Sequence, residues 1–119
     1  MIPLSVSSSE RRERSIKLLN LVDLESRIYH KPSELSGGQH QRVAIARSLV
    51  NNPKIVLMDE PTGNLDSKTS SQIVDFIVNL NKKNNQTFIL VSHSVERFEE
   101  YADHVIKLAD GKIEEEFRK

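Results

Sequence analysis

The sequence contains no cysteine and no tryptophan among its 119 residues. Without cysteine the chain forms no disulfide, offers no thiol nucleophile and cannot bind zinc through thiolates, a composition that fits a reducing compartment. Lysine plus arginine and aspartate plus glutamate each number 17, so the formal net charge is +0. A neutral chain gives no reason to expect nucleic acid or an anionic membrane surface as a partner.

Long apolar stretches are lacking as well. No run approaches the ~20 residues that a membrane-spanning helix requires. Residues 1–14 contain no apolar segment followed by a cleavage site, which argues against a signal peptide. We therefore expect one soluble intracellular domain of ordinary size, with 37% hydrophobic residues to form its core.

The order of predicted elements is typical of an α/β domain. Helical periodicity or capping signals predict helices over residues 7–24, 39–52, 67–84 and 94–103, with a helical turn at 25–32. Apolar runs at 54–60 and 87–93 predict two strands of a parallel sheet, buried on both faces. Residues 104–117 carry an Asp-Gly turn between two strand-like runs, which predicts a β-hairpin.

Polar side chains end both predicted parallel strands, Asp59 and Glu60 on the first and Ser92 and His93 on the second. Ligands of open α/β sheets bind at the carboxyl ends of strands, so these side chains are expected to face one crevice. Asp59 suits a hydrated Mg²⁺, and Glu60 is then placed to polarise an attacking water. Two solvated acids at a strand terminus are the alternative.

His93 has two interpretations of the same kind. It could sense a transferring phosphate through a hydrogen bond, or it could be a histidine where a strand meets solvent. Its predicted position on the same sheet edge as Asp59 and Glu60 favours the first.

The segment "LSGGQ" at 35–39 uses two of only four glycines in the chain. Ser36 and Gln39 fit a capping box, S-x-x-Q, ahead of an apolar-periodic helix. The capping box does not explain Gly37 and Gly38, because glycine in a helix costs ~1 kcal/mol relative to alanine. Glycine suits a place where a ligand approaches the backbone closely, and a helix N-terminus attracts phosphate.

Asp66 stands immediately before the predicted helix at 67–84. Aspartate is a favoured N-cap, which gives this residue a purely structural role. A contact across a subunit interface is the functional interpretation, and the two are compatible.

Together these segments resemble the nucleotide-binding domain of ATP-binding-cassette (ABC) ATPases, a P-loop NTPase fold with a signature helix. "LSGGQ" (35–39) is similar to the signature motif, "IVLMDE" (55–60) to Walker B with the catalytic glutamate, "NLD" (64–66) to the D-loop and His93 to the switch histidine. The stretch from 36 to 70 is most similar to the lipoprotein-release and macrolide-export branch. Ser94 departs from the aspartate that many members have after the histidine.

The resemblance implies ATP and Mg²⁺ as cofactors. It implies that Asp59 holds Mg²⁺ through water, that Glu60 is the catalytic base and that His93 contacts the γ-phosphate. The nucleotide bound by the opposite subunit of a head-to-tail dimer would be contacted by four signature residues, which are Ser36, Gly37, Gly38 and Gln39. Asp66 would couple the two sites across that dimer.

The phosphate-binding motif of the same family, G-x-x-x-x-G-K-[ST], does not occur in the sequence. Only Gly111 is followed by lysine, and Ile113 comes next. The adenine-stacking aromatic residue and the glutamine loop have no counterpart either. We therefore expect the C-terminal half of the family domain, with a helical signature part at 1–52 and a Walker B, D-loop and switch-histidine part at 53–119. Residues 1–4 resemble an interior stretch, so Met1 is expected to be an internal methionine.

Three hypotheses follow from these motifs. The first is part of an ABC transporter ATPase subunit that acts with a membrane permease, peripheral on the cytoplasmic face of the cell membrane. The second is a non-catalytic module that donates its LSGGQ face to a partner ATPase. The third, a DNA-repair or chromosome ATPase, requires long coiled coils for which the helix at 7–24 is too short. An unpaired sheet edge and an uncovered apolar face are expected in either surviving case.

Overall fold

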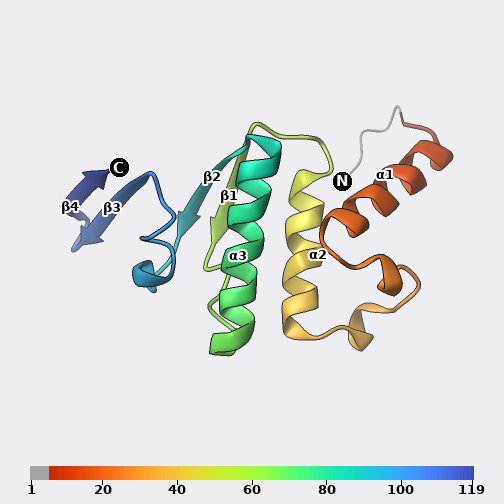
Figure 1. The fold of residues 1–119 in the computed structure, drawn as a ribbon, viewed down its shortest axis with the longest axis horizontal. Coiled ribbons are helices and arrows are strands. Elements are labelled where there is room, and N and C mark those ends of the chain that lie inside the picture. The colour runs from red at the N-terminus through yellow and green to blue at the C-terminus, as the bar shows by residue number, and fades with distance from the viewer. Residues whose placement is uncertain (1–5) are drawn as a thin grey trace.

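The computed structural model describes residues 6–119, so the expectation for residues 1–4 lies outside the described part. Its main elements are α1 (Ser8–Leu21), α2 (Gly37–Leu49), β1 (Ile55–Asp59), α3 (Ser67–Asn84), β2 (Thr87–Val91), β3 (His104–Ala109) and β4 (Lys112–Arg118). Single 3₁₀ turns, η1 (Glu25–Arg27), η2 (Pro32–Glu34) and η3 (Val95–Arg97), lie between them. The predicted order of helices and strands is confirmed except for the helix expected over 94–103 (Figure 1).

Polar side chains start each of the three long helices. Ser7 accepts a hydrogen bond from the backbone of Glu10 ahead of α1, and the Glu10 carboxylate accepts one from the backbone of Ser7. Ser36 and Gln39 form the same reciprocal pair ahead of α2, and Asp66 caps α3. These partners satisfy backbone N–H groups that have no acceptor inside the helix.

β1 and β2 are parallel neighbours in register from Ile55 opposite Thr87 to Asp59 opposite Val91. Parallel strands require a crossover, which α3 supplies. The backbone N–H of Glu60 donates to the Val91 carbonyl at 2.8 Å, which extends the ladder by one bond. Both strands therefore end at the same level of the sheet.

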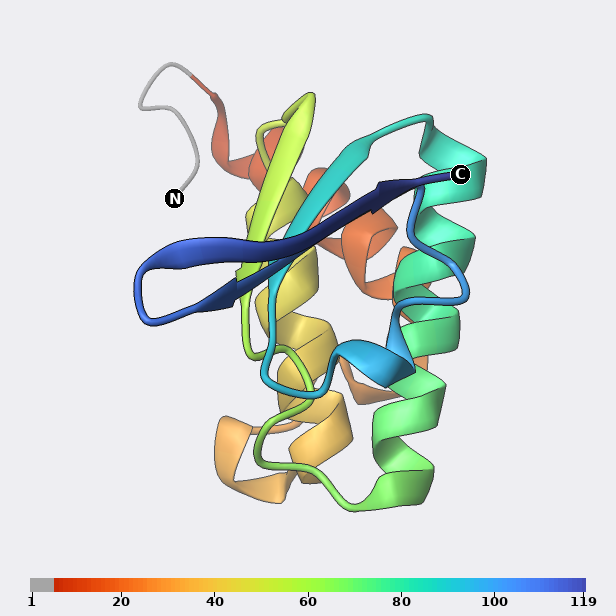
Figure 2. The ribbon, with the colours of Figure 1, turned by 90° about the vertical axis from the view of Figure 1, so that its left-hand side faces the viewer.

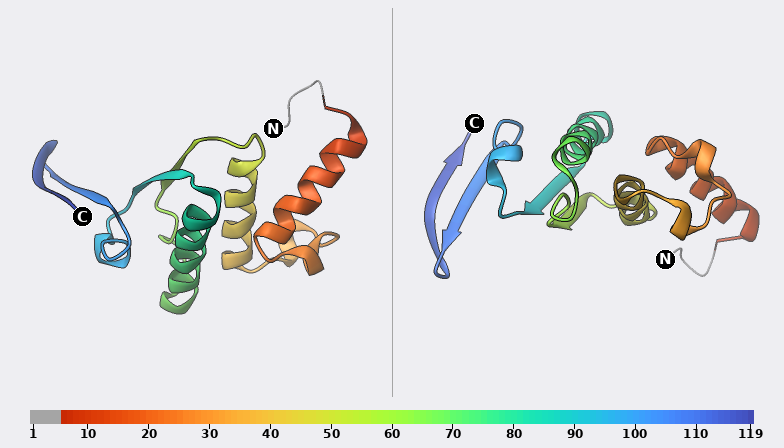
Figure 3. Two further views of the ribbon diagram at one scale, coloured as in Figure 1. Left: turned by 45° about the horizontal axis from the view of Figure 1, so that its top comes forward. Right: turned by 90° about the horizontal axis from the view of Figure 1, so that it is seen from below.

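The core lies between one face of this sheet and the helices. It contains apolar residues from the segment after α1, from α2, from β1 and from α3: Val22, Leu24, Ile45, Ala46, Leu49, Val56, Met58, Ile73, Phe76, Ile77 and Leu80. Figure 3 shows α2 and α3 between α1 at one end of the molecule and the hairpin at the other. The helices therefore pack against one face of the β1–β2 sheet and hold the βαβ unit together through this core.

The opposite face of the β1–β2 sheet is apolar and uncovered. Exposed fractions are 73% for Leu57, 62% for Val91, 55% for Ile55 and 50% for Ile89. The expectation of burial on both faces is therefore wrong for this chain. Alternate residues of β1 are buried or exposed, and the four apolar residues of the second face keep at least half of their surface accessible. The expectation of an uncovered apolar face is confirmed.

β3 and β4 form a separate antiparallel sheet, which confirms the predicted hairpin. Asp110 and Gly111 at its turn have φ of 48° and 73°, the conformation that an Asp-Gly hairpin turn requires. Figure 2 shows the hairpin crossing in front of the β1–β2 sheet.

The helix predicted over 94–103 is only the 3₁₀ turn η3 followed by further turns. Within residues 6–119, no helix combines the length and apolarity needed to cross a membrane.

Candidate functional site

Four element ends that carry the candidate residues lie at one end of the βαβ unit. The arrowheads of β1 and β2 point toward the end at which α2 and α3 begin (Figures 1 and 2). The carboxyl ends of the parallel strands and the N-termini of two helices are the positions at which α/β folds bind phosphate-bearing ligands.

Glu60 is the most connected of the candidate residues. Its Oε1 accepts hydrogen bonds from the His93 backbone N–H at 2.8 Å and from the side chain of His93, and its Oε2 accepts one from the Ser92 hydroxyl at 3.3 Å. Its φ of 45° places it in the left-handed region directly after β1. The expected convergence of Glu60 and His93 at one sheet edge is therefore observed.

These hydrogen bonds hold Glu60 in its ionised form. The His93 side chain, ahead of the opposing effect of desolvation, lowers the pKa of the Glu60 carboxyl below its ordinary value. Because a carboxylate only accepts hydrogen bonds, His93 Nδ1, 2.9 Å from Oε1, must carry a proton. A carboxylate that accepts three hydrogen bonds is also a weaker base than a free one.

Asp59 is the exposed last residue of β1. No described group of three histidine, cysteine, aspartate or glutamate side chains could enclose a metal ion. A single exposed carboxylate does fit Mg²⁺ of the kind that keeps several waters and is otherwise held by substrate phosphates. Asp59 thus suits a metal that arrives with a nucleotide and does not suit a site built from protein ligands alone.

The signature helix begins as predicted. Gln39 N–H donates to Ser36 Oγ at 3.3 Å, and Ser36 N–H donates to Gln39 Oε1 at 2.9 Å. Sequence reasoning missed a second reason for the two glycines. A Cβ on Gly38 would lie 2.6 Å from the Thr69 methyl carbon, and one on Gly37 would lie 3.2 Å from Leu65. The glycines therefore let α2 approach the start of α3 within this chain.

Asp66 caps α3, which confirms the structural interpretation of this residue. Its Oδ1 accepts the Thr69 N–H at 3.0 Å and its Oδ2 accepts the Thr69 hydroxyl at 2.5 Å. The Thr69 hydroxyl is the main cause of a lowered pKa of the Asp66 carboxyl. Ser70, fully buried, donates from its hydroxyl to the Leu65 carbonyl at 3.3 Å and so ties the 60–66 loop to α3.

Thr69 and Ser70 were not identified as site residues from the sequence, and Ser92 was noted only as a polar side chain at the end of the second strand. Each is a hydroxyl residue within four positions of a recognised one, but hydroxyl residues are common at helix starts and strand ends. Only their contacts with Asp66, Leu65 and Glu60 distinguish them.

A hollow of about 350 Å³ between the starts of α2 and α3 is lined partly by Ser36, Gly38, Gln39 and Thr69.

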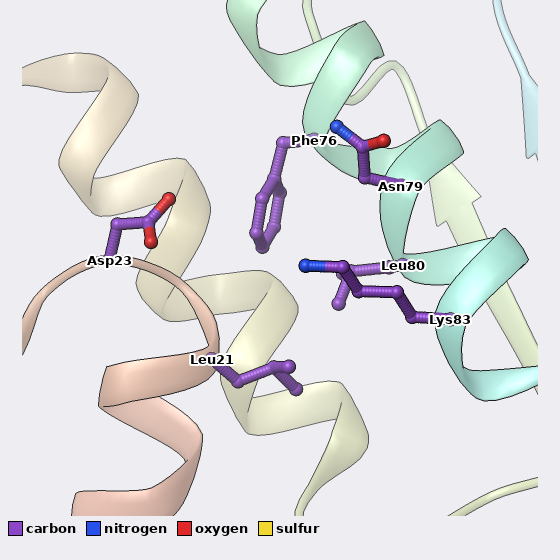
Figure 4. A pocket seen from close by; sticks show the side chains of 6 residues that line it. All are labelled: Leu21, Asp23, Phe76, Asn79, Leu80 and Lys83. Carbon is purple, nitrogen blue, oxygen red and sulfur yellow. The ribbon is translucent and has the colours of Figure 1, made fainter.

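A second hollow has a different character and position. Figure 4 shows it between the end of α1 and the second half of α3, with Leu21, Asp23, Phe76, Asn79, Leu80 and Lys83 around it. At 1.5 Å per residue, its nearest residue on α3, Phe76, lies roughly 15 Å along the helix from Asp66. None of its lining residues belongs to the strand-end cluster, although Asp23 lines both hollows.

Comparisons with known proteins agree with this geometry. The family model described as "ABC transporter" matches residues 4–63. An uncharacterized ABC transporter ATP-binding protein of Methanocaldococcus jannaschii, MJ0796, is 46% identical over 113 residues, which are 94% of this chain and 48% of that protein. The lipoprotein-releasing system ATP-binding protein LolD of Legionella pneumophila (strain Paris) is 45% identical over 116 residues, 95% of this chain and 51% of LolD.

Solved structures give the same result. The ADP conformation of an ATP-binding cassette of an ABC transporter, MJ1267, superposes with a TM-score of 0.87 at 32% identity, over 96% of this chain and 44% of that one. The dimeric structure of the MJ0796 cassette superposes with a TM-score of 0.76 at 44% identity, over 98% of this chain and 50% of that one. The chain thus spans about half the length of these relatives, and it belongs to the ABC transporter ATP-binding family.

Proposed function

We propose that this chain is the signature-bearing part of an ATPase subunit that couples ATP binding and hydrolysis to export across a membrane. The observation that carries the proposal is the cluster of Glu60 with Ser92 and His93 at the carboxyl ends of β1 and β2. A carboxylate positioned beside a histidine suits activation of water next to a phosphate. Similarity to LolD favours export as the process that is driven.

Each strand-end residue has a role in this proposal. Glu60 orients the attacking water and accepts its proton. His93 donates from Nδ1–H to Glu60. To donate from Nε2 to the γ-phosphate as well, both ring nitrogens would have to carry a proton, which is the imidazolium form. Asp59 would hold Mg²⁺ through water, and the ion would neutralise charge on the phosphates.

The signature residues act on a second subunit. Ser36, Gly37, Gly38 and Gln39 would contact the γ-phosphate of a nucleotide held by the opposite ATPase subunit in a head-to-tail dimer, and Asp66 would couple the two sites. The dimeric MJ0796 cassette is consistent with such an arrangement. Another neighbour, cbiO1 from Clostridium perfringens, is described as part of the ABC transporter complex cbiONQ. We therefore propose a permease subunit as the membrane partner, with this chain peripheral on the cytoplasmic face.

The 119 residues do not include the lysine-bearing phosphate loop. Without that cradle the β- and γ-phosphates lack their main ligands, so two copies of this chain form no complete site. We propose a helical signature part at 1–52 and a Walker B, D-loop and switch-histidine part at 53–119, both belonging to one incomplete cassette. The purified chain should hydrolyse no ATP above background. Hydrolysis that Glu60→Gln abolishes and the distant control Glu10→Gln preserves would overturn this proposal.

A non-catalytic module is the second candidate. The uncovered face at Leu57 and Val91 favours it, because an exposed apolar face suits association with another polypeptide. Mixing the chain with a cassette that has an intact phosphate loop and a mutated signature serine should restore some ATP turnover. The absence of any restoration, with complex formation verified, would count against donation of the signature face.

A further inference from the structure

Thr69 contacts both the D-loop aspartate and one signature glycine, Gly38, with different atoms of one side chain. Its hydroxyl donates to Asp66 Oδ2 at 2.5 Å, and its backbone N–H donates to Asp66 Oδ1 at 3.0 Å. Its methyl carbon Cγ2 lies 2.6 Å from the position that a Cβ on Gly38 would occupy. The same residue therefore touches two motifs that are 28 positions apart in the chain.

The two contacts constrain each other. The hydroxyl and the methyl group of threonine are both bonded to Cβ, so rotation about χ1 moves them together, and few χ1 rotamers are available in a helix. In the observed rotamer the hydroxyl reaches Asp66 and the methyl lies against Gly38. Another rotamer would break a charge-assisted hydrogen bond and would also place a different group against α2.

Gly38 has no side chain, so the Thr69 methyl lies directly against its backbone and a movement of that methyl acts on the backbone itself. It lies in the first turn of α2, next to the Ser36–Gln39 capping box. Gly37, its neighbour, is close to Leu65 at the end of the same loop that carries Asp66. The 60–66 loop starts at Glu60, whose carbonyl accepts the Gly63 N–H at 3.1 Å, so one short segment connects the three motifs.

From this geometry we infer that Thr69 is a positioning residue that transmits the state of Asp66 to the signature turn at Gly38 within one chain. A partner subunit that draws the Asp66 carboxylate out of its capping position would break the hydrogen bond from the Thr69 hydroxyl to Asp66 Oδ2. The rotamer of Thr69 then changes, and the first turn of α2 shifts with it. The functional meaning of this coupling, communication between the two nucleotide sites, rests on the proposed function.

The coupling can be tested on the chain alone, without nucleotide. Selective ¹⁵N labelling of glycine gives four backbone amide signals, because the sequence has only four glycines. Asp66→Ala should move the Gly38 signal by more than its linewidth and leave Gly111, in the hairpin turn, unmoved. In a Thr69→Ser background the cap persists but the methyl is absent, so Asp66→Ala should move Gly38 much less.

Thr69→Val supplies the matched second background, since it keeps a methyl and removes the hydroxyl that reaches Asp66. It should uncouple Gly38 from Asp66 as Thr69→Ser does. An equal Gly38 shift in the wild-type chain and in both Thr69 backgrounds would overturn the inference, as would no shift in the wild-type chain. Gly111, in the separate hairpin, serves as the unperturbed reference signal, and the far-UV circular dichroism of α1, α2 and α3 verifies that each variant is folded. ATP turnover plays no part in the readout, so failure of the proposed function would leave this result intact.

Discussion

Glu60 Oε1 accepts two hydrogen bonds from one residue, His93, with donor distances of 2.8 Å from its backbone nitrogen and 2.9 Å from its Nδ1. The carboxylate at the end of β1 is therefore held by the segment that follows β2. Its position depends on that segment as much as on its own backbone. A change in the chain around His93 would move or release the proposed base.

His93→Ala should raise the pKa of Glu60 toward its ordinary value, because the His93 side chain is the largest cause of the lowering. Ser92→Ala should raise it less, since the Ser92 hydroxyl is the smallest of the causes. The measurement is an NMR titration of the side-chain carboxyl of Glu60. Glu10 in α1, whose pKa is lowered by the N-cap residue Ser7, is the internal control, and its titration midpoint should not change. An unchanged Glu60 midpoint in His93→Ala would contradict the hydrogen-bond explanation.

The lowered pKa of Glu60 also determines how its contribution to the free energy of unfolding changes with pH. A carboxyl with a pKa lowered by folding contributes stability that is present above its unfolded pKa and is lost as the pH falls through the folded pKa. The free energy of unfolding of the wild-type chain should therefore exceed that of Glu60→Gln near neutral pH. The difference should shrink as the pH falls below about 4.5, which urea denaturation at several pH values measures.

The sequence predicted the local parts of the site well and their mutual contacts less well. The Ser36–Gln39 capping box, the Asp66 cap and the Asp-Gly hairpin turn each depend on residues within a few positions of one another, so local chemistry determines them. The parallel pairing also followed, because two apolar runs separated by a helix favour a βαβ unit. The contact of Thr69 with Gly38 joins separate helices, and no periodicity encodes the distance between them.

The two-sided burial expected for β1 failed for a related reason. The apolar run shows that both faces of the strand are suited to burial, but it does not show that a partner is present. Leu57 and Val56 are equally apolar, yet their exposed fractions are 73% and 3% because only one face meets the helices. Composition reports what a surface can bury, whereas tertiary structure determines what it does bury.

Gly38→Ala should destabilise the fold, although alanine is ordinarily better than glycine in a helix by ~1 kcal/mol. The new Cβ would lie 2.6 Å from the Thr69 methyl, and overpacking of this kind costs about 1–3 kcal/mol. Urea denaturation should show a net loss for Gly38→Ala. The loss should reverse in Gly38→Ala/Thr69→Ser, which lacks the clashing methyl. If Gly38→Ala alone is more stable than the wild-type chain, the clash with the Thr69 methyl relaxes at little cost.

Ser36→Ala and Ser7→Ala form a matched pair, because each removes the cap of a capping box. Both should lower the free energy of unfolding by ~1 kcal/mol. Only Ser36→Ala should lower the ATP turnover that the chain restores to a cassette with a mutated signature serine, since Ser7 lies far from the signature turn in sequence and caps a different helix. Equal losses of turnover in the two variants would mean that Ser36 acts through helix stability alone.

The uncovered sheet face should make the isolated chain self-associate. Leu57 is 73% exposed on that face, whereas its neighbour Met58 is 9% exposed and points into the core. Burying a leucine side chain is worth about 1.5–3 kcal/mol, so Leu57→Ala should weaken self-association about tenfold or more, measured by analytical ultracentrifugation. Its effect on the monomer should be small, because little of the side chain is buried there. Met58→Ala should instead destabilise the monomer by about 2–5 kcal/mol. A wild-type chain that stays monomeric at every concentration tested would show that this apolar face does not drive association.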